Sequence, residues 1–183
     1  MNHEDIQKIL ENMKNEIERQ KSLMPKDKLS MIVFSGDLDK LLAAFIIATG
    51  AAAMDIEVCM FFTFWATPAL RDPKKKPGLK DFMGKIFGFM LPKGVKEVKL
   101  SKMNMGGLGT KMMKNLMKKK NVKDLNELIK VAAELGVKIY ICEMSMNLMG
   151  FGQDEMIDYP NLEYVGVATF LKEAGESKMQ LFI

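Results

Sequence analysis

The sequence predicts an α/β fold, a three-layer α/β/α sandwich with a mainly parallel sheet of about five strands. Short runs of β-branched and aromatic residues alternate with longer stretches at helical spacing. The runs are apolar on both faces, which is typical of strands buried between two helical layers. The chain has 183 residues, 48% of them apolar, enough for one such domain.

The first segment, residues 1–25, is predicted to be an amphipathic helix attached to this domain. Apolar residues recur at helical spacing with charged residues between them, and Pro25 ends the pattern. The apolar positions are Ile6, Ile9, Leu10, Met13 and Ile17. We expect the helix to dock on the domain or on another subunit.

The domain itself is predicted to span residues 29–183. Strands are predicted over residues 29–35, 56–65, 137–146 and 178–183. Helices are predicted over residues 36–54, 110–121 and 122–136, with short helical turns over residues 145–150 and 153–158, and residues 162–174 are predicted to be a short strand that leads into a helix. Gly136 is expected to end the helix before the third strand.

Residues 66–110 interrupt this alternation and are predicted to form a long insertion. Pro68, Pro73, Pro77 and Pro92 punctuate it. Residues 79–91 (LKDFMGKIFGFML) resemble a helix weakened by two glycines, whereas residues 101–110 (SKMNMGGLGT) resemble a flexible loop. The three glycines within residues 101–110 are not followed by the strand-to-helix turn that binds phosphate in nucleotide-binding proteins.

The insertion and the helix after it are rich in lysine and methionine. Residues 74–120 hold 14 lysines against Asp81 and Glu97, a net charge of about +12, although the whole chain carries only +4. The segment could be a solvated basic face over core methionines, a contact with another subunit or partner protein, or a peripheral contact with an anionic membrane. Nucleic acid is the least favoured partner because no recognition motif accompanies the charge.

Cysteine and histidine are scarce. Two cysteines and His3 are too few for a structural zinc site or a disulfide scaffold, so we expect no metal and no cofactor. The first 22 residues are mostly charged and polar, unlike a signal peptide, and no apolar run is long enough to cross a membrane. We expect the protein in the cytoplasm.

Polar residues are expected to meet at the carboxyl edge of the sheet, where open parallel sheets bind and react. The stretches are SGDLDK after the first strand, FWATP after the second and CEMSMN after the third. Asp37 could cap its helix or help to hold a ligand. The expected strand-edge pocket contains Ser35, Gly36, Asp37, Trp65, Ser145 and Asn147.

Cys142 is the candidate catalytic residue at this edge. A thiol next to a helix N-terminus is favoured as thiolate and is then nucleophilic, although Glu143 beside it acts in the opposite direction. The alternative is a cysteine that is simply a small apolar residue at a strand end. Cys59 lies within the second strand and is expected to be a core residue; a disulfide with Cys142 needs neighbouring strands and matching depth.

Four segments together resemble the DsrE/DsrF/DsrH-like family, in its methionine-rich DsrE-like branch that is often labelled peroxiredoxin-family or sulfur-reduction protein. They are FSGDLDKLLAAFIIATGAAAMDIEVCMFFTFWA, KLSKMNMGGLGTKMMKNLMKKKNV, CEMSMNLMG and YVGVATFL. The resemblance covers residues 29–183 and omits the N-terminal helix. The peroxiredoxin label has no support, since no Pro-x-x-x-Thr-x-x-Cys pattern is present.

The resemblance implies a flavodoxin-like fold, homo-oligomers and sulfur relay, with a persulfide or thiosulfonate passing between partners such as rhodaneses and TusA-like carriers. It implies no metal. The family cysteine after the third strand corresponds to Cys142, but the reactive loop cysteine of other branches has no counterpart here. Three hypotheses follow: a sulfur carrier or sulfurtransferase, a non-enzymatic oligomeric module that binds partners, and a thiol redox sensor.

Overall fold

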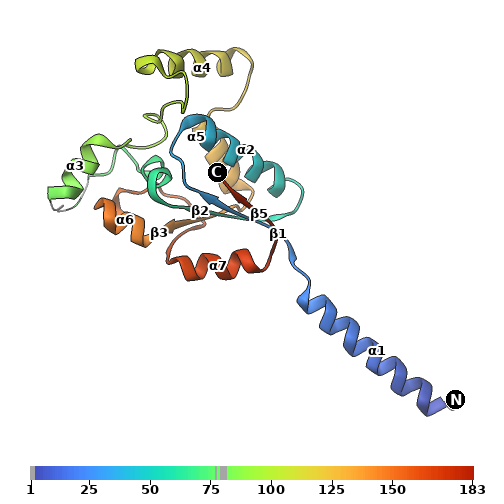
Figure 1. Ribbon diagram of the computed structural model, residues 1–183. Helices are drawn as coiled ribbons and strands as arrows, with labels where there is room; N and C mark the ends of the chain where they lie inside the picture. The colour runs from blue at the N-terminus through green and yellow to red at the C-terminus, as the bar shows by residue number, and fades with distance from the viewer. Residues whose placement is uncertain (1–2, 77, 79–81) are drawn as a thin grey trace.

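All five strands of the sheet run parallel. The computed structural model describes residues 3–76, 78 and 82–183. Its sheet has the order β4-β3-β2-β1-β5; Figure 1 labels β1, β2, β3 and β5. The strands are β1 (Lys26–Val33), β2 (Glu57–Phe62), β3 (Lys138–Cys142), β4 (Leu162–Val165) and β5 (Ser177–Phe182). The predicted fold class is confirmed.

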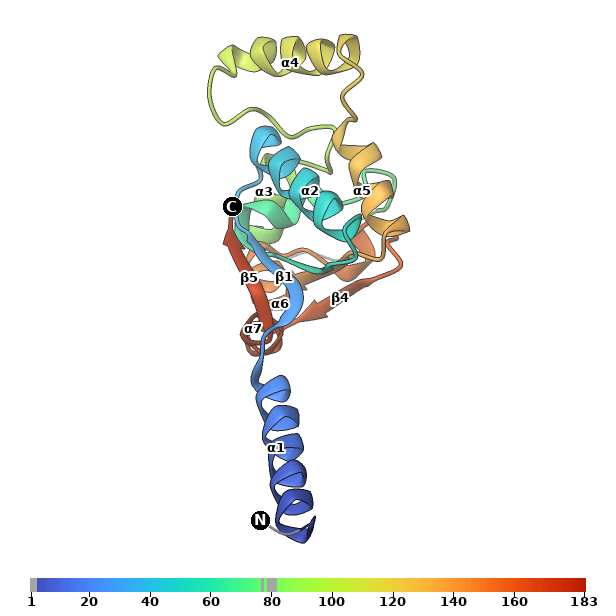
Figure 2. The same ribbon diagram turned by 90° about the vertical axis from the view of Figure 1, so that its right-hand side faces the viewer.

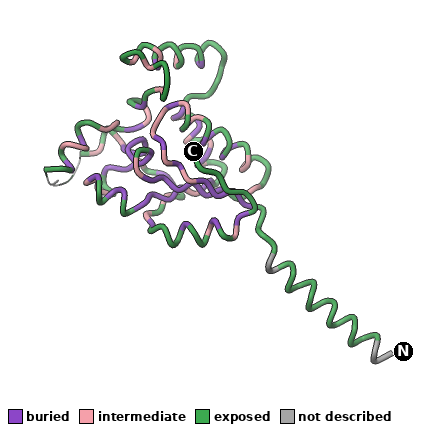
Figure 3. The backbone as a smooth tube through the Cα atoms, viewed as in Figure 1, coloured by how far each residue is buried: buried purple, intermediate pink, exposed green. Residues whose placement is uncertain are grey.

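Apolar side chains on both sides of the inner strands make the centre of the sheet. Along β2, Met60 and Phe62 lie in the larger core, whereas Cys59 and Phe61 lie in a smaller cluster on the opposite face. Figure 3 shows the inner strands as largely buried. This two-sided burial explains why their sequences lack the polar alternation of a half-exposed strand.

Helices cover the two faces unequally. Helices α2 (Leu38–Ala52) and α5 (Leu125–Glu134) lie on one face, and α7 (Val167–Gly175) lies on the other. The chain steps in one direction from β1 to β4 and then returns to the far side of β1. Because parallel crossovers are right-handed, the return places α7 opposite α2. The three layers resemble flavodoxin, whose strand order is 2-1-3-4-5 instead.

Two connections differ from the sequence prediction. Strand β2 ends at Phe62 rather than residue 65, because Phe64 takes a positive φ of 45° and begins the 3-10 helix η1 (Phe64–Leu70). Strand β3 ends at Cys142, and α6 (Glu143–Met149) follows without an intervening loop. The predicted end of α5 is confirmed, with Gly136 at a φ of +75°.

Parts of the insertion are helical. It contains α3 (Phe82–Met90), and the 3-10 turn η2 (Met105–Gly107) leads into α4 (Leu108–Lys119). The expected loop over residues 101–110 therefore includes the start of a helix. Gly107 makes that turn at a φ of 100°. Pro77 and residues 79–81 lie outside the described residues. The helix predicted over residues 79–91 begins with residues 79–81.

A buried ion pair ties the insertion to the domain. The guanidinium of Arg71 donates to the carboxylate of Glu155 at 2.9 Å and to the carbonyl of Pro92 at 3.3 Å. Glu155 belongs to the short helix η3 (Gln153–Glu155), and both side chains are at most 5% exposed. Arg71 also lies 4.6 Å from the centre of the Phe151 ring. One side chain thus joins the segment after β2, the end of α3 and the segment before β4.

Helix α1 (His3–Leu23) extends away from the sheet and is exposed along its described length, as Figures 2 and 3 show. Two residues, Met24 and Pro25, separate it from β1. The helix does not dock on its own domain. Within the described part of the chain, no helix is long and apolar enough to cross a membrane.

We expect Arg71→Met to lower the free energy of unfolding by about 3–5 kcal/mol, because it removes the guanidinium that pairs with the buried Glu155 carboxylate at 2.9 Å. Urea denaturation measures the change. Lys178→Met, which removes an exposed ion pair with Asp27 at 3.0 Å, is the control and should cost about 0–1 kcal/mol. Equal effects of the two substitutions would contradict a structural role for the buried pair.

Candidate functional site

The register of the sheet brings three strand ends to one level. Val33 of β1 pairs with Phe62 of β2, and Phe62 pairs with Ile141 of β3. The segments that follow these residues therefore start from the same edge. The three polar stretches expected to meet there do leave the sheet side by side.

Close contacts join the segments at this edge. The hydroxyl groups of Thr63 and Ser145 lie 2.8 Å apart, and both residues are buried. Gly36 packs against the backbone of Trp65, where an added Cβ would lie only 2.1 Å from the carbonyl oxygen. The absence of a side chain at Gly36 is thus what allows the first two segments to touch.

Asp37 occupies the N-cap position of α2 without capping it through its side chain. Its carboxylate instead accepts a hydrogen bond from the Ser35 hydroxyl at 2.8 Å and lies 3.9 Å from the Lys40 ammonium. The backbone N–H of Leu38 donates to the carbonyl of Lys99 in the insertion at 2.8 Å. Capping, the more common role of such an aspartate, is absent, and the carboxylate stays at the edge.

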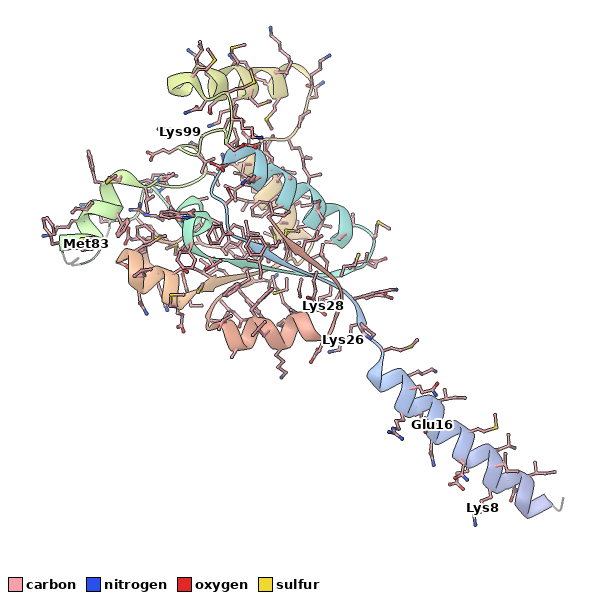
Figure 4. The ribbon with its side chains drawn as sticks, in the orientation of Figure 1. Lys8, Glu16, Lys26, Lys28, Met83 and Lys99 are labelled. Atoms are coloured by element: carbon pink, nitrogen blue, oxygen red, sulfur yellow. The ribbon has the colours of Figure 1, made fainter. Side chains whose placement is uncertain are left out.

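A cavity of about 750 Å³ opens beside these residues. Four of the six predicted pocket residues line it, namely Ser35, Gly36, Asp37 and Trp65. The remaining lining comes from the insertion: Phe89, Met90, Leu91, Pro92, Glu97 and Lys99. Figure 4 labels Lys99, which lies between the body of the domain and α4.

Two predicted pocket residues do not line this cavity. Ser145 is fully buried under the edge, where it contacts Thr63, and Asn147 is exposed on α6. The sequence analysis did not include the insertion residues in the pocket. The insertion folds against the edge of the sheet through contacts between residues far apart in the sequence, such as Arg71 with Glu155. A cluster of aromatic residues in the insertion was the only sequence signal of their role.

Cys142 lies at the carboxyl end of β3, as expected, but its side chain is only 3% exposed. It belongs to the apolar cluster beneath α7, together with Val165, Phe170 and Ala174. It is absent from the lining of the cavity of about 750 Å³. Cys142 thus lies at the carboxyl edge of the sheet, but its thiol is buried there.

Cys59 lies deeper in the same cluster and is fully buried. Burial raises the pKa of its thiol to about 12, and the Glu173 carboxylate adds to the increase. Cys59 pairs with Lys138, four residues before Cys142, so the two cysteines are offset by about 13 Å along the strands. A disulfide needs a Cα separation below about 7 Å, so this structure excludes the bond between them.

A charged group lies at the opposite end of that cluster. Lys28 is 3% exposed, and its ammonium donates to the carboxylate of Glu173 on α7 and lies 3.5 Å from that of Glu57; Figure 4 labels it at the base of the sheet. Nearby, Ser30 and Ser177 share a hydrogen bond of 2.7 Å. These polar contacts fix α7 over the amino ends of the strands.

The insertion and α4 expose many apolar side chains among lysines. On α3, Phe82 and Phe89 are 76% and 85% exposed. On α4, Met112 and Leu116 are more than half exposed and share a second cavity of about 540 Å³ with Met103. Among the described residues, no group of three His, Cys, Asp or Glu side chains could hold a metal ion.

Comparison with known proteins finds a match to the model of the DsrE/DsrF/DrsH-like family over residues 25–182. The chain is 48% identical to the uncharacterized protein YrkE of Bacillus subtilis (strain 168) over 156 residues, which cover 85% of this chain and 96% of YrkE. It is 37% identical to the sulfur carrier protein DsrE2 of Allochromatium vinosum over 164 residues, which cover 87% of this chain and 100% of DsrE2.

The raised pKa of Cys59 predicts an unreactive thiol. Relative to the ordinary pKa of 9.0, a pKa of about 12 lowers the thiolate fraction at neutral pH by about 10³-fold. In the Cys142→Ser variant, where Cys59 is the remaining thiol, iodoacetamide labelling should be slow in the native state and fast in urea. The Cys59→Ser variant gives the matched rate for Cys142. Equal native and denatured labelling rates for Cys59 would contradict its burial.

Proposed function

Because the chain belongs to the DsrE/DsrF/DrsH-like family, we propose that it is a sulfur carrier that holds sulfane sulfur on Cys142. The observation that carries the proposal is the relation to DsrE2, which is named a sulfur carrier protein and is aligned over its whole length. The ordered carboxyl edge of the sheet supports it further, since this is where parallel sheets commonly place reacting groups.

Two observations favour Cys142 over Cys59 as the sulfur-bearing residue. Cys142 is the last residue of β3, one residue from an exposed position at Glu143. Cys59 is inside β2, and its raised pKa opposes formation of the thiolate that attacks sulfur. The proposed carrier therefore uses the thiol nearest to the edge.

The proposed step is an exchange between sulfur atoms. The Cys142 thiolate attacks the terminal sulfur of a donor persulfide, R–S–SH. A new S–S bond forms to Cys142, the donor S–S bond breaks, and the donor leaves as a thiolate. The proton stays on the transferred sulfur, and repetition of the step with an acceptor thiolate restores Cys142. The exchange needs no external oxidant or reductant.

The 3% exposure of Cys142 means that its cover must move before this exchange. The cover includes Val165, at the end of the four-residue edge strand β4, and Phe170 on α7. Strand β4 has a neighbour on one side only, so local opening at this edge disrupts fewer contacts than opening at the centre. We propose that contact with the donor protein opens the cover, which would keep the thiol from small oxidants between transfers.

Protein partners are part of this proposal. The family resemblance suggests a rhodanese as donor and a TusA-like carrier as acceptor, with this protein as a homo-oligomer. Both partners would meet the carboxyl edge and the lysine-rich insertion beside it. The lysines would speed association with an acidic partner surface.

A second candidate function is a partner-binding module in which Cys142 is structural. The exposed side chains on α3 and α4 favour it, because Phe89, Met90 and Met112 are more than 60% exposed. Large apolar side chains grouped in this way mark contact surfaces. The two candidates differ in whether Cys142 gains sulfur.

We expect incubation with polysulfide together with a rhodanese donor to add sulfur to Cys142, because contact with the donor protein opens the cover over the cysteine nearest to the edge. The reaction is carried out on the folded protein, and mass spectrometry of its peptides then locates the added sulfur. The Cys142→Ser variant should gain none, and the Cys59→Ser variant should gain as much as the unchanged protein. Sulfur on Cys59, or on neither cysteine even with a rhodanese donor present, would rule out the carrier proposal.

We expect Lys118→Glu combined with Lys119→Glu to weaken binding of a TusA-like carrier by about tenfold at low salt, because α4 loses attraction for an acidic surface. Isothermal titration at two salt concentrations measures the effect, which should shrink at high salt. Lys130→Glu combined with Lys172→Glu makes the same change in net charge elsewhere. Equal loss in both double variants would mean that total charge, and not the α4 surface, governs binding.

A further inference from the structure

Helix α1 has an apolar face that no other described part of its own chain covers. The side chains of this face are between 43% and 60% exposed: Ile6, Ile9, Leu10, Met13 and Ile17. Figure 3 shows the helix exposed throughout its described length. In proteins most helical stability comes from packing of an amphipathic face, so we expect this face of α1 to pack against a partner.

We propose that α1 pairs in parallel with α1 of a second copy of the chain, as a short two-stranded coiled coil. This inference is independent of the proposed sulfur chemistry. It concerns a segment that lies before the family match over residues 25–182.

The spacing of the apolar residues is that of a coiled-coil seam. Ile6, Leu10, Met13 and Ile17 follow one another at intervals of four, three and four residues. This places Leu10 and Ile17 at heptad position a, and Ile6 and Met13 at position d. A heptad repeat averages 3.5 residues per turn, which keeps a single stripe facing a partner helix along the whole length.

The charges beside the seam favour a second, parallel copy. In this heptad frame Glu16 is at position g and Lys21 is five residues later at position e. In a parallel pair these positions face each other across the interface, so symmetry gives two Glu16–Lys21 contacts. In the antiparallel alignment that joins the same four apolar layers, Glu16 instead faces Ile9. The parallel alignment alone pairs opposite charges.

The remaining surface of α1 argues against a membrane as the occupant. The helix His3–Leu23 carries four basic side chains against five acidic ones. A helix that lies on an anionic membrane is typically rich in lysine and arginine on its polar face. Figure 4 shows Lys8 and Glu16 among the polar side chains that project from α1 into solvent.

Cross-linking of the full chain tests the pairing and its direction. Gln20 is at position d, so the two copies of this residue face each other in a parallel pair. Asn15, at position f, faces away from the seam and is the matched control. We expect the Gln20→Cys variant to form a dimer on a non-reducing gel after treatment with oxidised glutathione, and the Asn15→Cys variant to stay monomeric on the same gel.

A second substitution separates the coil from any association of the α/β domain. Leu10→Asp with Ile17→Asp, added to the Gln20→Cys variant, should abolish the cross-link, because it places charges in the seam. Lys8→Asp with Asn15→Asp adds two aspartates to the same helix outside the seam and should retain the cross-link. Circular dichroism of each variant checks that the domain stays folded.

Three results would overturn the proposal. Equal cross-linking of the Gln20→Cys and Asn15→Cys variants would indicate random collision of two mobile helices. Absence of cross-linking in both would indicate that α1 does not pair in parallel. Co-sedimentation of the full chain with phosphatidylglycerol vesicles, lost on Leu10→Asp with Ile17→Asp and without a cross-link in solution, would identify a membrane as the occupant.

Discussion

The register of the parallel sheet is the constraint on which the candidate site depends. Its hydrogen bonds align Val33, Phe62 and Ile141, so three successive strand ends leave the sheet at one level. This alignment brings Gly36 against the Trp65 backbone and Thr63 against Ser145. A shift of one residue in β2 would exchange its two faces and break both contacts, and the same shift in β1 or β3 would break one of them.

Depth in the sheet gives the two cysteines different chemistry. Cys59 and Cys142 point to the same face and share one apolar cluster, yet their offset along the strands places one in the middle of the sheet and the other at its end. The raised pKa of Cys59 keeps its thiol protonated, and its position leaves no route for a partner. Cys142 shares its apolar cluster with Val165, at the end of the short edge strand β4, and with Phe170 on α7. A carrier would therefore regulate the access of its partners to the Cys142 thiol.

Much of the fold could be predicted from the sequence because its signals are local. Apolar runs and the Gly136 stop reflect properties of residues near one another in the chain, and the strands and α5 appear close to their expected positions, although β2 and β3 end earlier. The exposure of Cys142 and the lining of the cavity could not be predicted in the same way. Whether α7 covers the thiol depends on the return of the chain from β4 to β5, and Phe89 and Lys99 reach the edge through contacts between distant segments. The role of the Asp37 side chain could not be predicted either. Its carboxylate accepts a hydrogen bond from the Ser35 hydroxyl and makes no capping hydrogen bond to α2.

The attachment of α1 to the amino end of β1 has a consequence for how copies or partners can be arranged. Strand β1 runs from that junction toward the carboxyl edge, so the helix and the candidate site lie at opposite poles of the domain. Whatever holds α1 therefore leaves the mouth of the site unobstructed. The linker of two residues, one of them a proline, also gives the helix little rotational freedom relative to an inner strand. An anchored α1 would thus act as a stalk that aims the reactive pole outward, toward incoming proteins.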